Sequence, residues 1–306
     1  MTIRKMANTC FALTCIFSLA LLGSCSNDSA DDNLVNDQYL LIPDNHFEQL
    51  LIDQGIDTDG TLNGQMLQED AEKIERLDIN LNSHFGDIED LTGVEGFVNI
   101  TFLSAIGQNL QEIDLSSNTK LDTLYLQNNN LKTIDLSKNT RLILVNVLQN
   151  ELNAVSGLEQ ATRLKFLNLS YNYFEGFSIT NASLEHLLIS NNVLTSFSSS
   201  GVPNLKSILL TTNQLGSVDL SSNPSLETLV ISDNSLEGIH LADNPNLQYF
   251  YASSNMMTQL DVSQNPALID LRVDRNPNLS CIKIKSGQEI PTVTLSEYQK
   301  LNEDCE

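Results

Sequence analysis

The sequence LDTLYLQNNNL at residues 121–131 decides the fold, because its pattern returns along most of the 306-residue chain. The pattern is L-x-x-L-x-L-x-x-N-x-L, and its fourth and sixth residues alternate with polar neighbours. This period of two indicates a short strand whose apolar side chains point inward. Ten units begin at Ile74, Ile100, Leu121, Leu142, Leu164, Leu184, Leu205, Leu226, Leu247 and Leu268. Such regular spacing predicts a stacked repeat protein with one coil per unit.

The ninth place of every unit holds a carboxamide: Asn82, Gln108, Asn129, Asn150, Asn172, Asn192, Asn213, Asn234, Asn255 and Asn276. A carboxamide can bond the backbone groups of adjacent turns that no strand ladder reaches. A second alternating phrase, such as Ile134-Asp135-Leu136-Ser137, predicts an extended return rather than a helix. A second column then marks the next corner: Asn118, Asn139, Asn181, Asn223, Asn244 and Asn265. We interpret both columns as structural.

These units resemble the leucine-rich repeat family, in the short-repeat, internalin-like form of bacterial surface proteins. The resemblance covers roughly residues 74–280. It implies a β-rich α/β solenoid, a right-handed superhelix of about ten units of about 21 residues each. A parallel concave sheet and a slender, extended convex side are expected.

Both ends of the array depart from the pattern. Residues 39–73 form the predicted amino-terminal cap, in which Asp44 begins a short helix that stops at Gly55. Residues 281–306 form the predicted carboxy-terminal cap. Cys281 and Cys305 flank it. They are the cysteines that remain when Cys10 and Cys15, in a predicted export signal, and Cys25, a predicted lipidation site, are set aside. Two remaining thiols in an exported protein indicate one disulfide bond.

The first 24 residues are predicted to be a targeting signal, with a basic start and an apolar stretch at 9–22. Leu22-Gly23-Ser24-Cys25 resembles the lipobox of bacterial lipoproteins, which implies lipidation of Cys25 and a bacterial outer-membrane lipoprotein exposed at the cell surface. The alternative is a plain secretory signal in which this cysteine falls by chance. Residues 25–38 are acidic and polar, as in a flexible tether.

Charge restricts the partners. The 39 acidic residues outnumber 16 basic ones, for a net charge of -23, which excludes nucleic acid as a partner. Contact with a membrane is expected only through the lipid anchor, and a monomer is expected. The four histidines lie in different units and no catalytic motif is present, so neither enzymatic activity nor a cofactor is predicted.

The segment Asp57-Thr58-Asp59-Gly60 resembles the start of a calcium-binding loop, with Asp57 and Asp59 as weak candidate metal ligands. It departs from the loop template, because glycine falls at the fourth place instead of the sixth. Gln68 also stands where a bidentate glutamate is needed. A plain acidic turn is the preferred interpretation.

The third, fifth and seventh residues of each unit are predicted to line the concave face. In the eight central units these 24 positions carry no charge, in a chain with 18% charged residues. Charge returns only at Arg76, Asp78, Asp270, Arg272 and Asp274. The candidate ligand-binding residues are Phe102, Tyr125, Leu144, Asn146, Phe166, Asn168, His186, Leu188, Leu209, Val230, Tyr249 and Tyr251.

Apolar and aromatic residues with hydroxyl and amide groups are typical of protein interfaces. We therefore predict a surface-anchored adhesin or receptor that binds a protein or peptide on this face. One alternative is a glycan-capture protein, in which aromatic rings stack on sugars while Asn146, Asn168 and His186 bond hydroxyls. The chain lacks tryptophan, which favours the protein partner. Another alternative is that the residues only pack against their neighbours along the stack.

Overall fold

The computed structural model describes residues 38–80 and 86–305. The predicted signal, Cys25, Asn82 and all of the tether except Gln38 lie outside the described residues. In the part of the chain that the structure describes, no helix has the length and apolar character to cross a bilayer.

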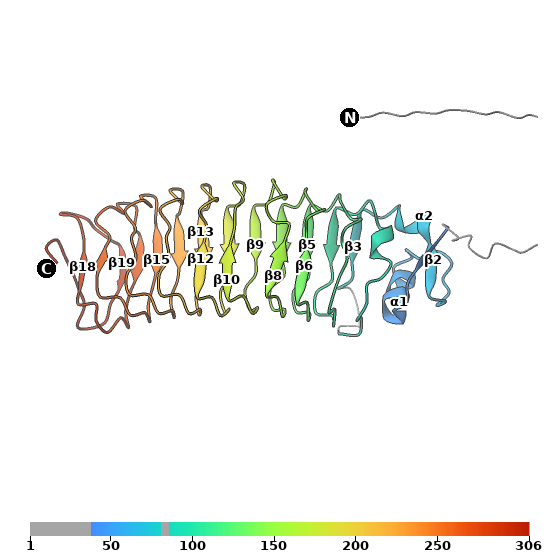
Figure 1. Cartoon of the computed structure of the whole chain (residues 1–306), viewed down its shortest axis with the longest axis horizontal. Helices are drawn as coiled ribbons and strands as arrows, with labels where there is room; N and C mark the ends of the chain where they lie inside the picture. The colour runs from blue at the N-terminus through green and yellow to red at the C-terminus, as the bar shows by residue number, and fades with distance from the viewer. Residues whose placement is uncertain (1–37, 81–85, 306) are drawn as a thin grey trace, which may run out of the picture. The chain divides into compact units, whose positions relative to one another are not determined.

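The principal element is a parallel sheet of eleven strands, one from each successive coil, whose order follows the chain (Figure 1). Adjacent strands pair without offset, so that equivalent residues of successive units lie side by side. The central residue of each strand points into the core, as Leu124 and Leu229 do. The strands are β3 (Arg76–Asp78), β4 (Phe102–Ser104), β5 (Thr123–Tyr125), β7 (Leu144–Asn146), β9 (Phe166–Asn168), β11 (His186–Leu188), β13 (Ser207–Leu209), β14 (Thr228–Val230), β15 (Tyr249–Tyr251), β17 (Asp270–Arg272) and β19 (Thr292–Thr294). The predicted parallel-sheet solenoid is confirmed.

The return segments are extended, as the second alternating phrase predicts. Three short parallel sheets form there, from β6 (Thr133–Asp135) with β8 (Ala154–Ser156), β10 (Gly176–Ser178) with β12 (Ser196–Ser198), and β16 (Leu260–Asp261) with β18 (Cys281–Lys283) and β20 (Lys300–Asn302). In the phrase Asp-x-Ser, the aspartate accepts the serine N–H at 2.8–3.0 Å in four coils. This bond lowers the pKa of Asp114 and Asp135 below the ordinary value.

Both asparagine columns are buried hydrogen-bonding ladders, which confirms their structural role. From Asn129 to Asn276, each ninth-place Nδ2 donates to a carbonyl of the preceding coil at 2.8–3.1 Å. Each Oδ1 accepts a backbone N–H of that coil at 2.9–3.2 Å. In the second column, Asn139 donates to Leu115 and Asn118 carbonyls, and the other members repeat the arrangement. The side chains thus replace the strand ladder at both corners.

The amino-terminal cap contains β1 (Tyr39–Leu41), paired antiparallel with β2 (Gln65–Leu67), and the helices α1 (Asn45–Asp53) and α2 (Gln68–Ala71). A short 3-10 helix, η1 (Val94–Gly96), follows in the next coil. Asp44 caps α1 as predicted, because its carboxylate accepts the N–H groups of His46 and Phe47. Buried Phe47 closes the end of the core.

Glu48 in α1 is fully buried, which the sequence did not lead us to expect. Its carboxylate accepts the backbone N–H groups of Asn63, Gly64 and Gln65 at 2.8–3.2 Å. These bonds replace the lost hydration of the charge. They also tie the loop before β2 to the helix.

The array runs one coil beyond the boundary predicted at Cys281. The predicted disulfide between Cys281 and Cys305 is present, but the segment that it closes still repeats: β19 joins the large sheet and β20 pairs with β18. Gln299 donates to the Val273 carbonyl and Gln288 to the Val262 carbonyl, so glutamines take the positions of the two asparagine ladders. The expectation of a non-repeating cap is corrected in this respect.

Candidate functional site

Sheet pairing brings the twelve candidate residues together on one surface of the array. We call the outward side chains at the third, fifth and seventh places of the eight central units the sheet face. Phe102, Leu144, Phe166, His186 and Tyr249 lie in one column of aligned positions. The next column contains Tyr125, Asn146, Asn168, Leu188, Leu209, Val230 and Tyr251. The sequence periodicity therefore placed all of them on the correct sheet.

Most of these side chains are half-buried, and Tyr249 is the most open at 37% exposed. Asn168 is only 7% exposed, and its Oδ1 accepts the N–H of Ser170 at 3.1 Å. The amide oxygen of Asn168 therefore holds the end of its own strand, and contact of Asn168 with a ligand stays a prediction. Asn146 makes the same bond to the N–H of Leu148 at 3.2 Å but stays half-buried.

Aromatic rings of adjacent strands contact one another across the sheet face. The ring centroids of Phe102 and Tyr125 are 5.8 Å apart, and those of Phe166 and His186 are 6.5 Å apart. Part of each ring area thus packs along the stack, as the packing alternative predicts. The same contacts restrict the rotamers of the rings, which lowers the entropy that a ligand would have to remove.

An arginine stacks on an aromatic ring at each end of the sheet face. The guanidinium of Arg76 lies 3.4 Å from the Phe102 ring centroid, and that of Arg272 lies 4.3 Å from the Tyr251 ring centroid. Each arginine also bonds an aspartate two residues away in its own strand, at 3.1 Å in β3 and 2.7 Å in β17. The Arg272 hydrogen bond holds the pKa of Asp270 below its usual range. These pairs bound the uncharged surface.

Charges beside the sheet face form two shared ion pairs that we did not predict. Glu185 accepts Nζ of Lys165 at 2.6 Å and of Lys206 at 2.7 Å, and these bonds lower the pKa of Glu185 to about 2. Asp122 receives Arg141 at 3.3 Å and Arg163 at 3.4 Å. The sequence signal for the ion pairs of Glu185 was the charge that recurs at the second place of successive units, next to the third-place residues of the sheet face.

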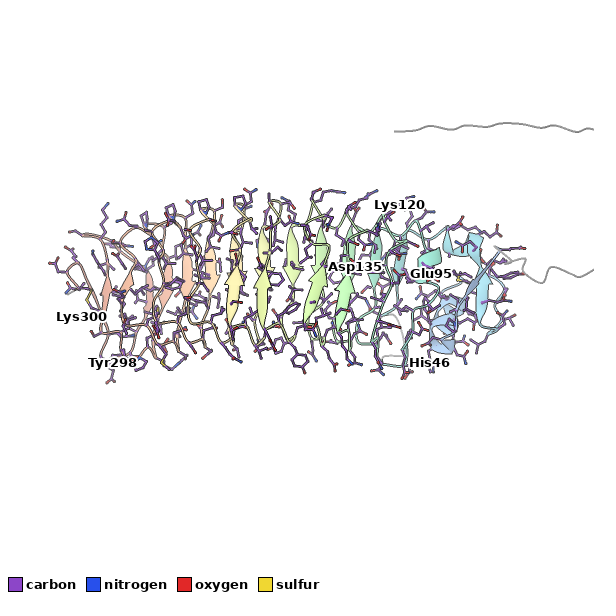
Figure 2. All side chains as sticks on the ribbon, viewed as in Figure 1. His46, Glu95, Lys120, Asp135, Tyr298 and Lys300 are labelled. Carbon is purple, nitrogen blue, oxygen red and sulfur yellow. A yellow bond between two sulfur atoms is a disulfide. The ribbon has the colours of Figure 1, made fainter. Side chains whose placement is uncertain are left out.

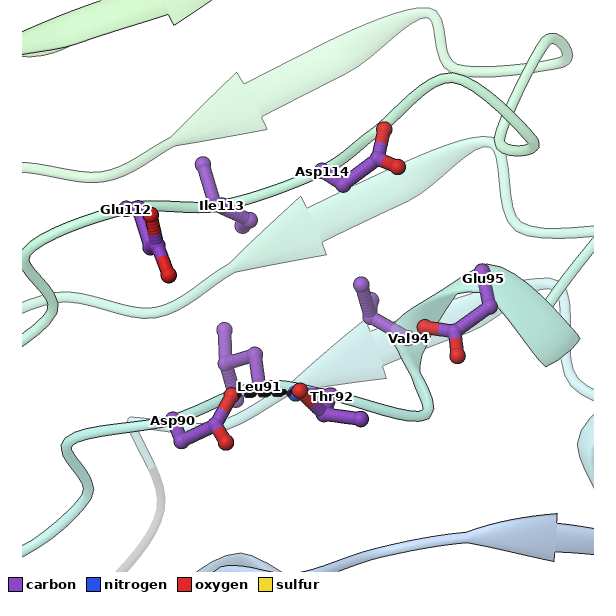
Figure 3. Close-up of a pocket in the computed structure, with 8 residues that line it drawn as sticks. All are labelled: Asp90, Leu91, Thr92, Val94, Glu95, Glu112, Ile113 and Asp114. Carbon is purple, nitrogen blue, oxygen red and sulfur yellow. Dashed lines mark hydrogen bonds between the residues drawn. The ribbon is translucent and has the colours of Figure 1, made fainter.

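Other charged residues lie away from the sheet face. Figure 2 places Lys120 at an edge of the array and Asp135 over its strands. A hollow of about 400 Å³ is lined by Asp90, Glu95, Glu112 and Asp114, together with apolar residues such as Leu91, Val94 and Ile113. Figure 3 shows these side chains. Asp90 accepts the N–H of Thr92 at 2.8 Å, and Asp114 makes the Asp-x-Ser bond. These two carboxylates therefore stabilise local turns.

The acidic turn near the amino end uses three of the four carboxylate oxygens of Asp57 and Asp59 in hydrogen bonds of its own. Asp59 accepts the N–H of Thr61 at 2.7 Å and the side-chain amide of Asn63 at 3.1 Å, while Asp57 accepts the N–H of Asp59. Over residues 38–80 and 86–305, no three histidine, cysteine or acidic side chains are grouped to hold a metal ion. The plain acidic turn stays the preferred interpretation, and the buried Oδ2 of Asp57 has no hydrogen-bond partner among the described residues.

Asp57 gives a pH-dependent prediction. Burial and the nearby Asp59 carboxylate raise its pKa to about 6, from 3.8. Because the folded-state pKa exceeds the unfolded one, stability falls as the pH rises from about 4 to about 6 and then stays low. Asp57→Asn is expected to raise the free energy of unfolding by about 2 kcal/mol at pH 8 and to change it little at pH 4. Chemical denaturation at both pH values measures this, and an equal gain at both would contradict the assignment.

Comparison with known proteins gives no match to a family model and no match to a curated protein. Solved structures do match. The functional domain of InlJ from Listeria monocytogenes is 20% identical, with a TM-score of 0.52 over 87% of this chain and 71% of that one. A leucine-rich repeat protein of Leptospira interrogans is 20% identical, with a TM-score of 0.55 over 70% and 71%. A chain of the LRIM1/APL1C complex is 26% identical, with a TM-score of 0.59 over 76% of this chain and 47% of that one.

The molecule is a parallel-sheet solenoid with little helix and a disulfide near its carboxy end. Its fold is the leucine-rich-repeat fold, structurally like that of the Listeria and Leptospira proteins.

Proposed function

We propose that this protein binds a protein partner through the sheet face. The observation that carries the proposal is the uncharged surface of β4 to β15, bounded at both ends by an arginine stacked on an aromatic ring. A partner can displace water from an uncharged surface at little electrostatic cost, because no charge has to be desolvated. A chain of similar fold is part of the LRIM1/APL1C complex, which supports a protein partner but does not specify the surface that binds it.

The size and chemistry of the surface fit a folded partner better than a short peptide. Eight strands at about 4.8 Å spacing give a length of about 35 Å. Tyr125, Phe166 and Tyr249 lie along this length and supply the ring area typical of binding hot spots. The Oδ1 atoms of Asn146 and Asn168 already accept backbone N–H groups, which weakens the case for a glycan on the same face.

The proposal includes the location of the protein. The Leu22-Gly23-Ser24-Cys25 sequence supports a lipid anchor on Cys25. We infer an outer-membrane lipoprotein displayed at the cell surface, where the sheet face acts as an adhesin or receptor. Two acyl chains or more would hold it stably in the membrane. Protease treatment of intact cells tests the display, because a surface-exposed domain is digested and a periplasmic one is protected.

The binding proposal is tested with the wild-type protein on an array of extracellular proteins and on a glycan array, side by side. Saturable binding to a protein is expected. The double variant Tyr125→Ala, Tyr249→Ala should weaken that binding by about 100-fold, because an aromatic ring is lost near each end of the sheet face. The matched control Tyr39→Ala, Tyr298→Ala removes two exposed tyrosines elsewhere and should bind normally. Binding to glycans alone, or equal binding by the face variant, would refute the proposal.

A further inference from the structure

A second surface stands out at the corner that follows the large sheet. There the eighth residue of each unit has a positive φ of 54–57° from Asn128 to Arg275, and the ninth is the buried ladder asparagine. The residues on either side of the ladder are turned to solvent. In three successive units the eighth residues are Asn128, Gln149 and Tyr171, all exposed. Their alignment follows from backbone bonds, since the Asn129 N–H donates to the Gln149 carbonyl and the Asn150 N–H to the Tyr171 carbonyl.

These outward residues border a shallow hollow of about 370 Å³. Asn109, Asn128, Asn130, Gln149 and Glu151 line it, and Gly107 adds no side chain to fill it. We call this surface the amide corner. The carboxamides of Asn128, Asn130 and Gln149 make no side-chain hydrogen bond within residues 38–80 and 86–305, in contrast to the fully bonded ladder beside them. Their donors and acceptors are free for a ligand.

Two exposed tyrosines adjoin the amide corner in the next coil. Tyr171 is 54% and Tyr173 is 60% exposed. The Tyr173 N–H donates to the Leu152 carbonyl, which places its coil directly beside that of Gln149 and Glu151. Exposed aromatic rings next to unbonded carboxamides combine an apolar platform with polar groups that both donate and accept.

This combination matches the chemistry of a sugar. A pyranose has a face of C–H groups, which packs on an aromatic ring, and a rim of hydroxyls, each of which donates and accepts hydrogen bonds. The carboxylate of Glu151 and the net charge of -23 disfavour an anionic saccharide. We propose that the amide corner, with Tyr171 and Tyr173, binds a neutral oligosaccharide. This site is separate from the sheet face and does not depend on the function proposed for it.

Affinity electrophoresis tests the site with defined probes. The protein is run through gels containing dextran, mannan or galactomannan, with dextran sulfate as the charged counterpart of dextran. Retardation by at least one neutral polysaccharide is expected, with none by dextran sulfate. The variant Tyr171→Ala, Tyr173→Ala should raise the dissociation constant about tenfold, since both ring platforms are lost.

The control Tyr39→Ala, Tyr298→Ala should be retarded like the wild type. Because Tyr171 has a positive φ, the single variant Tyr173→Ala provides a test without any change at that backbone position, and a loss of about threefold is expected. The variant Tyr125→Ala, Tyr249→Ala should keep sugar binding, which separates this site from the sheet face. No retardation by any neutral polysaccharide, or undiminished retardation of the Tyr171 and Tyr173 variants, would overturn the proposal.

Discussion

Asn213→Ala is expected to lower the free energy of unfolding by about 3–5 kcal/mol, since the buried N–H of Leu194 loses its partner and the carbonyls of Ile189 and Leu210 each lose one of two amide donors. In the native protein Asn213 donates to the carbonyls of Ile189 at 3.1 Å and Leu210 at 3.0 Å. Its Oδ1 accepts the N–H of Leu194 at 3.1 Å. Alanine removes all three bonds and leaves a space without hydrogen-bond donors. The loss of stability should therefore be among the largest for any substitution that leaves the surface of the protein unchanged.

Calorimetry measures the loss of stability, and hydrogen exchange locates it. The Leu194 amide should lose protection in the variant, together with amides of the coils on either side. Asn278→Ala is the matched control, because Asn278 is exposed and should change stability by less than about 0.5 kcal/mol. A melting temperature equal to that of the wild type would show that the asparagine ladder does not stabilise the stack.

The second large effect is expected on binding. Leu209 is half-buried at the centre of the sheet face, between Leu188 and Val230 in adjacent strands. Leu209→Asp should weaken binding of the protein partner by about 100-fold, because the new carboxylate would be desolvated against a surface without a cation. Kinetic binding assays measure the change, and the dissociation rate should increase most.

Ser221→Asp provides a control for this variant, since Ser221 belongs to the same coil and is exposed in the return segment. It adds the same charge and should bind like the wild type. Circular dichroism should show both variants folded. If the two substitutions weaken binding equally, total charge rather than the sheet face determines affinity.

Much of the fold follows from the sequence, because in a repeat protein the same structural positions recur in every unit and are occupied by the same residue types. The apolar fourth and sixth residues predicted the strands, and the ninth-place carboxamides predicted the ladder that Asn129 to Asn276 form. The sequence pattern did not predict the last coil, because Gln288 and Gln299 occupy the asparagine positions. Glutamine has one more methylene, so its spacing along the chain differs and the pattern no longer matches.

The candidate site was predicted less completely. Strand alternation assigned every candidate residue to the correct surface, but it does not say how deep a side chain lies. Asn168 illustrates this, since its bond to Ser170 arises from the bend of the backbone after β9. The stacking of Arg76 on Phe102 and the exposure of Tyr171 also depend on contacts between coils. A single sequence gives no measure of such contacts.

Photo-crosslinking tests the central claim, that the partner contacts the sheet face, most directly. A benzophenone amino acid is placed at position 209 on the sheet face or at position 219 in the return segment of the same coil, and each protein is irradiated with its partner. A covalent adduct is expected from position 209 alone. An adduct from position 219 alone, or equal adducts from both positions, would contradict the claim.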